Sequence, residues 1–317
     1  MIEKQFKNLD EQLEIFKHKG MIINDEKYTK RVLLRENYFF LNGYRHLFLV
    51  SETDRVFKPG TTFEEMYSLF LFDRSFRNVI FKYLLVIENN LKSITSYQLS
   101  KKYGYRERDY LKEKNFTQAP EKQAQLKDLL RKVKRQIRVN GSQHSATLHY
   151  VSNYGYIPLW ILVKVLSFGI VSEMFSILKP EDQVDIAKIY DIDVNDLIIY
   201  LPILANYRNL CAHEDILYEN RTQKAINDTV YHQLLKIPKQ DGEYTQGKND
   251  LFTLIIIMKQ MLANEEFKNM TYELENVIGT LNFNLHTISI DAVLNRMGFP
   301  KNWKDIANIE RSGDLNE

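Results

Sequence analysis

The chain has 317 residues, of which 44% are hydrophobic and 26% charged, a composition typical of a globular protein and not of a disordered or fibrous one. Its formal net charge is only +2, so a basic surface for a charged partner must come from local clustering. Glycine (12) and proline (7) are scarce, which argues against an all-β chain with many tight turns. We therefore expect an all-α fold.

The same features bear on the cellular compartment. The only cysteine, Cys211, cannot form an internal disulfide, so nothing requires an oxidising environment. Residues 1–20 are polar and mixed in charge, unlike a signal peptide. The longest mostly apolar stretch, residues 157–171, is too short to span a membrane and contains Lys164. We expect a cytoplasmic protein that has no membrane partner.

Residues 1–60 are predicted to form an N-terminal helical segment packed on a core. Apolar residues at spacings of three and four predict a helix over residues 3–19, which Gly20 would end. A second helix is expected to begin at Glu26 and to run to about residue 48, and residues 51–61 should form a loop around Pro-Gly. The stripe of the first helix comprises Phe6, Leu9, Leu13 and Phe16.

Residues 61–235 are predicted to form the helical core, with a basic insertion at about 101–140. Thr62 and Glu65 match a capping box and should open a long helix that reaches residue 99. After an irregular stretch at residues 103–118, an apolar stripe predicts a helix at 120–138. The stripe consists of Leu126, Leu130, Val133 and Ile137.

Turn-forming residues predict a loop at 140–158. Helices are then expected at 159–178, after Pro180 and at 195–213, followed by a loop at 235–250. Residues 236–317 should form a C-terminal helical segment. We expect the three segments to make one compact unit.

The basic insertion is a candidate RNA-binding surface. Between Lys101 and Arg138 there are 13 Lys/Arg and 5 Asp/Glu residues, so positive charge is concentrated there. Phosphate contacts supply most of the non-specific affinity for nucleic acids, although a run of charges is also typical of a solvated helix face. The candidate contacts are Lys127, Arg131, Lys134, Arg135 and Arg138.

Several common catalytic motifs are absent from the sequence. There is no Gly-rich phosphate loop, no HExxH and no paired CxxC, and the seven histidines are dispersed without metal-ligand spacing. We therefore expect neither a cofactor nor a metal.

The segment at residues 204–221 contains the groups best suited to chemistry: Arg208, Asn209 and His213. On a helix, Asn209 and His213 share a face, whereas Arg208 and His213 lie about 140° apart. Both can therefore act on one atom only through the reach of the arginine, a local helix ending or a second subunit.

This trio of residue types suits RNA cleavage by the 2′-hydroxyl group. Histidine titrates near neutral pH and can remove the hydroxyl proton or protonate the leaving oxygen. A forked guanidinium stabilises charge on the non-bridging phosphate oxygens, and an amide can orient either group. The alternative is a salt-bridged arginine beside a helix-terminal histidine, without catalysis.

The motif and several ordered blocks resemble the abortive-infection family of the AbiD/AbiF type, which is placed in the HEPN superfamily. The blocks are RNLCAH (208–213), ILYENR (216–221), NYFFLNGY (37–44), TFE (62–64), LFDR (71–74), Arg77, IE (87–88), PLW (158–160), LSFG (166–169), MGFP (297–300) and Trp303. They span nearly the whole chain and are more specific than one short motif.

This resemblance implies a helical HEPN-type core with additional N- and C-terminal helices that forms homodimers, in which Arg208, Asn209 and His213 of two subunits face each other. It implies a metal-independent endoribonuclease that acts as a growth-arresting toxin in anti-phage defence and can be restrained by a small non-coding RNA. Arg77 and Glu88 would support the site, although Glu88 can equally be a salt-bridged helix position.

Three hypotheses follow for the function. The first is the HEPN endoribonuclease toxin, with RNA as its substrate. The second is a non-cleaving RNA-binding module of a phage-defence ribonucleoprotein, held with a small non-coding RNA. The third is an interaction scaffold that binds no nucleic acid.

Overall fold

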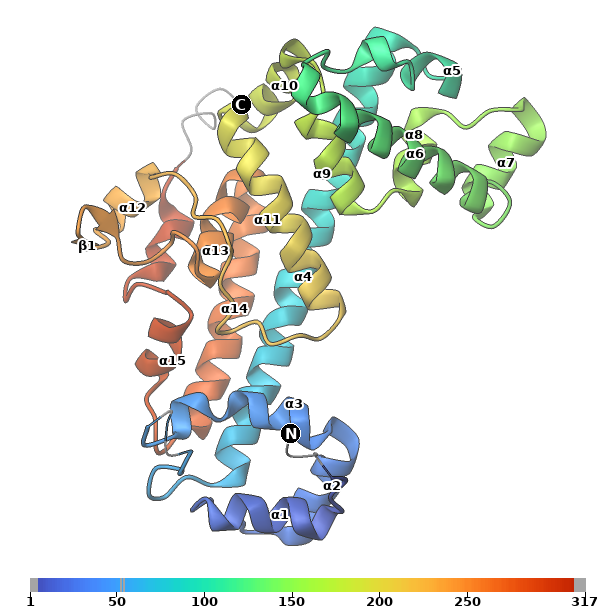
Figure 1. The fold of residues 1–317 in the computed structure, drawn as a ribbon. Helices are drawn as coiled ribbons and strands as arrows, with labels where there is room; N and C mark the ends of the chain where they lie inside the picture. The colour runs from blue at the N-terminus through green and yellow to red at the C-terminus, as the bar shows by residue number, and fades with distance from the viewer. Residues whose placement is uncertain (1–4, 52, 54, 311–317) are drawn as a thin grey trace.

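The computed structural model describes residues 5–51, 53 and 55–310, and its regular structure is almost entirely helical (Figure 1). The predicted all-α class is confirmed. The strands found in these residues, β1 (Lys239–Gln240) and β2 (Glu243–Tyr244), form one short antiparallel hairpin. No helix within the described ranges is long and apolar enough to cross a membrane.

The central element is α4 (Phe63–Tyr103), whose 41 residues extend roughly 60 Å. As predicted, it begins at Thr62, whose hydroxyl accepts from the backbone N–H of Glu65 at 3.1 Å. The Glu65 carboxylate does not complete the capping box. It accepts instead from the N–H groups of His286 and Thr287, both at 2.7 Å, and so ties the start of α4 to the C-terminal segment.

The N-terminal segment comprises α1 (Leu9–His18), α2 (Glu26–Glu36), α3 (Tyr38–Asn42) and the 3₁₀ helix η1 (Gly43–Phe48). Residues 5–8 of the predicted first helix are not helical, because Asn8 caps α1 in a capping box and Phe6 is 90% exposed outside it. Residues 3 and 4 of that prediction lie outside the described residues. The predicted second helix is broken at Asn37. This residue has φ 64° and its side chain accepts from the N–H of Phe39, which starts α3 in a new direction.

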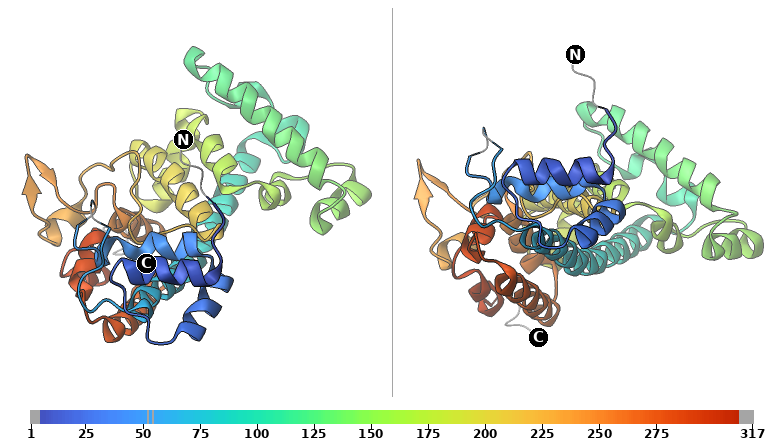
Figure 2. Two further views of the ribbon diagram at one scale, coloured as in Figure 1. Left: turned by 60° about the horizontal axis from the view of Figure 1, so that its bottom comes forward. Right: turned by 90° about the horizontal axis from the view of Figure 1, so that it is seen from below.

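An arm projects from the body at the C-terminal end of α4 (Figures 1 and 2). It comprises α5 (Glu107–Tyr110), η2 (Glu113–Asn115), η3 (Pro120–Lys122), α6 (Gln123–Asn140) and α7 (Ser145–Tyr154). The predicted helix at 120–138 is confirmed. The predicted loop at 140–158 was only partly right, because residues 141–144 and 155–158 are non-helical whereas residues 145–154 form α7. There the buried Thr147 hydroxyl bonds to the carbonyls of Asn140 and His144.

Two shorter helices replace the single helix predicted at 159–178: α8 (Leu159–Val165) and α9 (Phe168–Ser176). The break occurs because the Ser167 hydroxyl accepts from the N–H of Ile170 and starts a new helix. The chain continues through α10 (Pro180–Ala187), η4 (Lys188–Tyr190) and α11 (Val194–Ala212). The C-terminal helices are α12 (Val230–Leu234), α13 (Leu251–Met261), α14 (Asn264–Asn284), α15 (Ile290–Arg296) and η5 (Trp303–Asn308).

Helices α8, α11 and α14 pack against α4, so the longest helix contacts elements from most of the chain. Helix α13 is almost wholly buried, as expected for a helix that is apolar on all sides. This packing holds α11 beside α4 and leaves the C-terminal end of α11 directed toward the N-terminal segment (Figure 1).

Candidate active site

The C-terminal end of α11 carries the three residues singled out in the sequence. Tyr207 and Cys211 are buried and hold this helix in the core, whereas Asn209 and His213 are exposed. His213 follows the last helical residue, and its backbone N–H donates to the carbonyl of Asn209 at 3.0 Å. Within the described ranges, the side chains of Asn209 and His213 have no hydrogen-bond partner, so both are available to a ligand.

Arg208 is held by a buried carboxylate on α4. Its Nε donates to Oε2 of Glu88 at 3.1 Å, and Nζ of Lys92 donates to Oε1 of Glu88 at 2.7 Å. Glu88 is only 4% exposed, while Arg208 is half-buried with its guanidinium 5.7 Å from the ring centroid of Phe81. The terminal amino groups of Arg208 have no hydrogen-bond partner among the described residues. The forked end of the guanidinium is therefore free to bind an anion.

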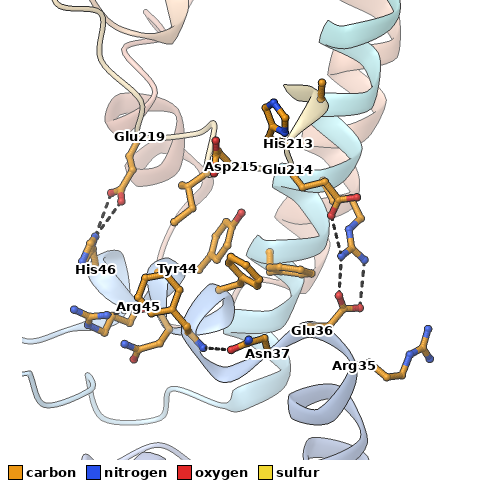
Figure 3. Close-up of a pocket in the computed structure, with 18 residues that line it drawn as sticks. Arg35, Glu36, Asn37, Tyr44, Arg45, His46, His213, Glu214, Asp215 and Glu219 are labelled. Atoms are coloured by element: carbon orange, nitrogen blue, oxygen red, sulfur yellow. Dashed lines mark hydrogen bonds and ion pairs between the residues drawn. The ribbon is translucent and has the colours of Figure 1, made fainter. Parts of the chain in front are cut away.

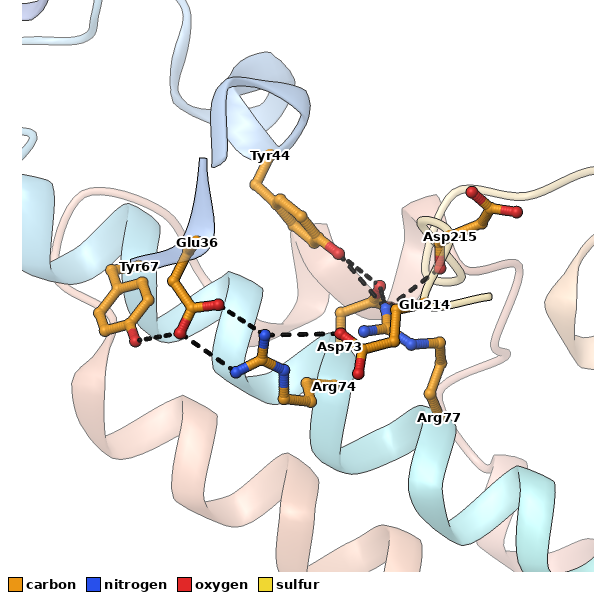
Figure 4. Close-up of polar contacts among 8 residues, drawn as sticks. All are labelled: Glu36, Tyr44, Tyr67, Asp73, Arg74, Arg77, Glu214 and Asp215. Carbon is orange, nitrogen blue, oxygen red and sulfur yellow. Dashed lines mark hydrogen bonds and ion pairs between the residues drawn. The ribbon is translucent and has the colours of Figure 1, made fainter. Parts of the chain in front are cut away.

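Arg77 lies in a buried network that fixes the chain after His213 (Figure 4). Its Nη1 donates to Oδ2 of Asp73 at 2.7 Å and to the backbone carbonyl of Asp215 at 3.1 Å. Asp73 also accepts from the N–H groups of Leu217 at 3.0 Å and Tyr218 at 2.8 Å. Complete burial raises the pKa of Asp73, an effect that the Arg77 charge and these N–H donors oppose. Arg77 thus positions the loop from a buried site, whereas the side chain of His213 is exposed.

A pocket of about 840 Å³ lies beside His213, between the N-terminal segment, α4 and the chain after α11 (Figure 3). Arg74 pairs with Glu36 at 2.7 Å on one side of it, and Nδ1 of His46 lies 3.1 Å from Oε1 of Glu219 on the other. The pocket lining also includes Arg35, Phe39, Phe40, Arg45, Glu214 and Asp215. Cations, carboxylates and aromatic rings therefore surround a space large enough for part of a nucleotide chain.

The structure does not bring the three predicted catalytic residues together in one pocket. His213 lines the pocket, whereas Arg208 and Asn209 do not, and in the described chain Arg208 pairs with Glu88 and not with His213. The pocket residues of the N-terminal segment were missed by the sequence reasoning, which used the NYFFLNGY block only as a family resemblance. Its three consecutive aromatic residues, of which Phe39 is 75% exposed, were the available signal.

All five predicted RNA-binding residues of α6 are exposed. Arg131 pairs with Asp128 at 3.1 Å. The other four have no ion-pair partner within the described part of the chain; they are Lys127, Lys134, Arg135 and Arg138. The arm that carries them joins the C-terminal end of α4, whereas the pocket includes residues near the N-terminal end of that helix, so the two surfaces are separate.

Other reactive groups are poorly placed for catalysis. Burial raises the pKa of the Cys211 thiol to about 12, so almost none of it is the nucleophilic thiolate at neutral pH. The residues that the structure describes contain no group of three or more His, Cys, Asp or Glu side chains able to hold a metal ion.

The fold and the site define an all-helical protein with an Arg-Asn-x₃-His motif at the end of a buried helix and a polar pocket beside it. A family model for Abi-like proteins matches residues 31–219, and the chain belongs to this family. The match begins in α2 and ends at Glu219, so it includes α4, the arm, α11 and the pocket. Membership implies an abortive-infection, anti-phage role. No curated protein and no solved structure matches the chain.

Proposed function

We propose that this Abi-like protein is a metal-independent endoribonuclease of the HEPN superfamily and of the AbiD/AbiF type, which arrests growth during abortive infection. One observation carries the proposal. The end of α11 presents Asn209 and His213, which are exposed and have no side-chain hydrogen-bond partner among the described residues, close in sequence to an arginine that a buried carboxylate holds in place. His213 also lines the pocket, so its imidazole is available to a ligand bound there.

The proposed reaction needs only RNA and these side chains. One imidazole removes the proton of a 2′-hydroxyl group, whose oxygen attacks the adjacent phosphorus. The bond from phosphorus to the 5′-oxygen then breaks, and an acid protonates that oxygen, which leaves a 2′,3′-cyclic phosphate and a 5′-hydroxyl end. The terminal amino groups of Arg208 stabilise the charge on the non-bridging oxygens, and Asn209 orients the phosphate or the imidazole. DNA lacks the attacking hydroxyl and is not cut.

A second copy of the chain completes this site. Arg208 and His213 leave α11 on different sides, about 140° apart on an ideal helix. In a homodimer that pairs the ends of two α11 helices, His213 of one copy meets Arg208 of the other. Two histidines are then present, one as the base and one as the acid.

Mapping RNA ends in cells tests the proposal. The parent, His213→Ala and Arg208→Ala would each be induced in a bacterial host, with growth followed and 5′-hydroxyl ends mapped in total RNA. His18→Ala is the matched control, because His18 is also an exposed histidine at the end of a helix. We expect new ends and growth arrest with the parent and the control only. If His213→Ala is as toxic as the parent and leaves the same ends, the proposal fails.

A second candidate is a non-cleaving RNA-binding protein of a phage-defence ribonucleoprotein. Four basic residues of α6 have no ion-pair partner in the part of the chain that the structure describes, and they favour this candidate because their charge remains available to phosphate. In that case RNA co-purifies with the parent and with His213→Ala alike, no new ends appear, and neutralising α6 releases the RNA. An interaction scaffold, by contrast, retains no RNA at all.

A further inference from the structure

A chain of aromatic rings runs over the surface of the arm and continues onto the start of α8. Neighbouring ring centroids lie 5.4–6.3 Å apart, a range typical of interacting aromatic pairs. We call this set the aromatic strip, and it comprises Tyr105, His149, Tyr150, Tyr154, Tyr156 and Trp160.

The strip is open to solvent. Tyr154 is 58% exposed, Trp160 44% and Tyr105 41%. By contrast, tyrosines such as Tyr200 and Tyr207 are buried in the core. Aromatic rings contribute most to stability when they are buried, so a connected row left in water indicates a surface that is covered by a partner.

An unpaired cation lies over the strip. The Arg106 guanidinium is 5.1 Å from the ring centroid of Tyr156 and 5.8 Å from that of Tyr105. Among the described residues, Arg106 has neither an ion-pair partner nor a side-chain hydrogen bond. Its charge and its flat face are therefore available to an incoming anionic group that also stacks.

Further positive charge adjoins the strip through α5. A groove between α5 and α6 is lined by the basic residues Arg108, Lys112 and Lys134 and by one acidic residue, Glu107, so positive charge predominates. Helix α5 is fastened to the segment that carries Tyr156, because the Tyr110 hydroxyl donates to the carbonyl of Ile157 at 2.8 Å. The groove is therefore tied through α5 to the segment that carries part of the strip.

We propose that the aromatic strip binds unpaired RNA, whose bases stack on the rings while its phosphates contact Arg106 and the groove. Stacking on protein rings requires bases that are free of a duplex, and it tolerates any sequence because every base has a flat face. The basic surroundings favour RNA over an apolar protein surface. The assignment to RNA rests on the proposed function, but binding at the strip does not depend on cleavage.

Binding of a labelled RNA tests the assignment directly. The full chain carrying His213→Ala, which does not consume the probe, would be titrated into fluorescein-labelled 12-nucleotide oligoadenylate and followed by anisotropy. We expect Tyr105→Ala with Trp160→Ala to raise Kd at least tenfold, since each ring stacks about one base. The pair Tyr105→Phe with Trp160→Phe should keep Kd within about threefold. Tyr272→Ala is the control, because Tyr272 is an exposed tyrosine on α14, outside the arm.

Two further measurements separate the outcomes. Oligoadenylate should quench the fluorescence of the exposed Trp160, while Trp303 is buried in the core. Duplex RNA of equal length should not compete for the strip. A Kd that is unchanged after removal of both rings overturns the proposal. The proposal also fails if the ring variants differ from the parent only in self-association, measured by analytical sedimentation, because the strip is then an interface between copies of the chain. If the parent cleaves RNA and the ring variants cleave it with an unchanged KM, this inference fails but the proposed function stands. If the protein binds RNA at the strip but never cleaves it, the proposed function fails but this inference stands.

Discussion

Nε of Arg208 on α11 donates a hydrogen bond to Oε2 of Glu88 on α4, 120 residues earlier in the chain. The other oxygen of Glu88 accepts from Lys92, so one buried carboxylate lies between two cations. A buried carboxylate needs such partners, and their removal leaves an uncompensated charge. The same contact fixes the direction of the arginine that we propose to act on RNA.

Glu88 is expected to act as a positioning residue. Glu88→Gln should lower the single-turnover rate of RNA cleavage about ten- to hundredfold with little change in RNA affinity, because Arg208 loses its charged anchor and small misplacements are costly in catalysis. Lys92→Met is the matched control, since it leaves the Arg208 contact intact. Equal losses in the two variants would show that the carboxylate serves stability only.

The Asp73 network should dominate the stability of the loop after His213. Asp73→Ala leaves Arg77 buried without its partner and removes the acceptor for the N–H groups of Leu217 and Tyr218. We expect the free energy of unfolding in urea to fall by about 3–5 kcal/mol. Tyr44→Phe removes the hydrogen bond that Tyr44 donates to Asp73 and a long one that it accepts from Arg77, but leaves the Arg77–Asp73 ion pair in place, and should cost about 1 kcal/mol. A smaller loss in the first variant than in the second would contradict this account.

Neutralising the unpaired basic residues of α6 should weaken RNA binding through phosphate contacts. We expect the triple variant Lys134→Gln, Arg135→Gln, Arg138→Gln to bind RNA of any sequence more weakly than the parent does. The slope of log K against log salt concentration should become shallower by roughly 0.7 for each lost contact. Lys132→Gln is the control, because Lys132 is already paired with Asp128 and Glu173. Identical slopes in the parent and the triple variant would exclude α6 from the RNA interface.

The Cys211 thiol should react slowly in the folded protein. Burial raises its pKa to about 12, so the thiolate fraction at pH 7.5 is very small and reagents have little access. Labelling with iodoacetamide, followed by mass spectrometry, should be at least tenfold slower in native protein than in urea. Cys211→Ser should also cleave RNA at the parental rate. Rapid labelling of Cys211 in the native protein would show that the C-terminal end of α11 unfolds locally.

The stability of the C-terminal segment should decrease in acid because of His232. Nδ1 of this buried histidine accepts from the Thr229 N–H at 3.0 Å, while Nε2 lies 3.0 Å from the Gly247 carbonyl, so the neutral ring satisfies both contacts. Burial lowers the pKa of His232 below its ordinary value of 6.5. As the pH falls below about 6.5, His232 therefore binds a proton in the unfolded chain but stays neutral in the folded chain.

We therefore expect the stabilising effect of the neutral ring to be present above pH 6.5 and to be lost progressively as the pH falls toward the folded-state pKa. The melting temperature measured between pH 7.5 and 5.5 should fall more steeply for the parent than for His232→Gln. Parallel profiles for the two proteins would show that another group accounts for the acid sensitivity.

Helices were predictable where a strong local pattern agreed with the packing. Thr62 was recognised as the start of α4, and the apolar stripe of α6 predicted the side that is buried. Predictions failed where one side chain bonds to a nearby backbone group. Asn37 and Ser167 each start a new helix in this way, and their type alone does not tell whether the chain turns there.

The candidate site shows the same division. Arg208, Asn209 and His213 were identified from a local motif, whereas the roles of Asp73 and of the N-terminal pocket residues were not. Asp73 lies 144 residues before Leu217, with which it forms a hydrogen bond, and no local pattern encodes such a contact.

The sequence by itself determined that the chain is helical, that its family is the Abi-like one and which short motif is the candidate for chemistry, because periodicity and motifs are local properties. The tertiary structure decided that Glu88 holds Arg208, that the pocket forms between α3 and the end of α11, and that the rings of the arm and of α8 form one strip. These features depend on how α4 packs against the rest of the chain. Burial and distance between remote residues arise only from that packing.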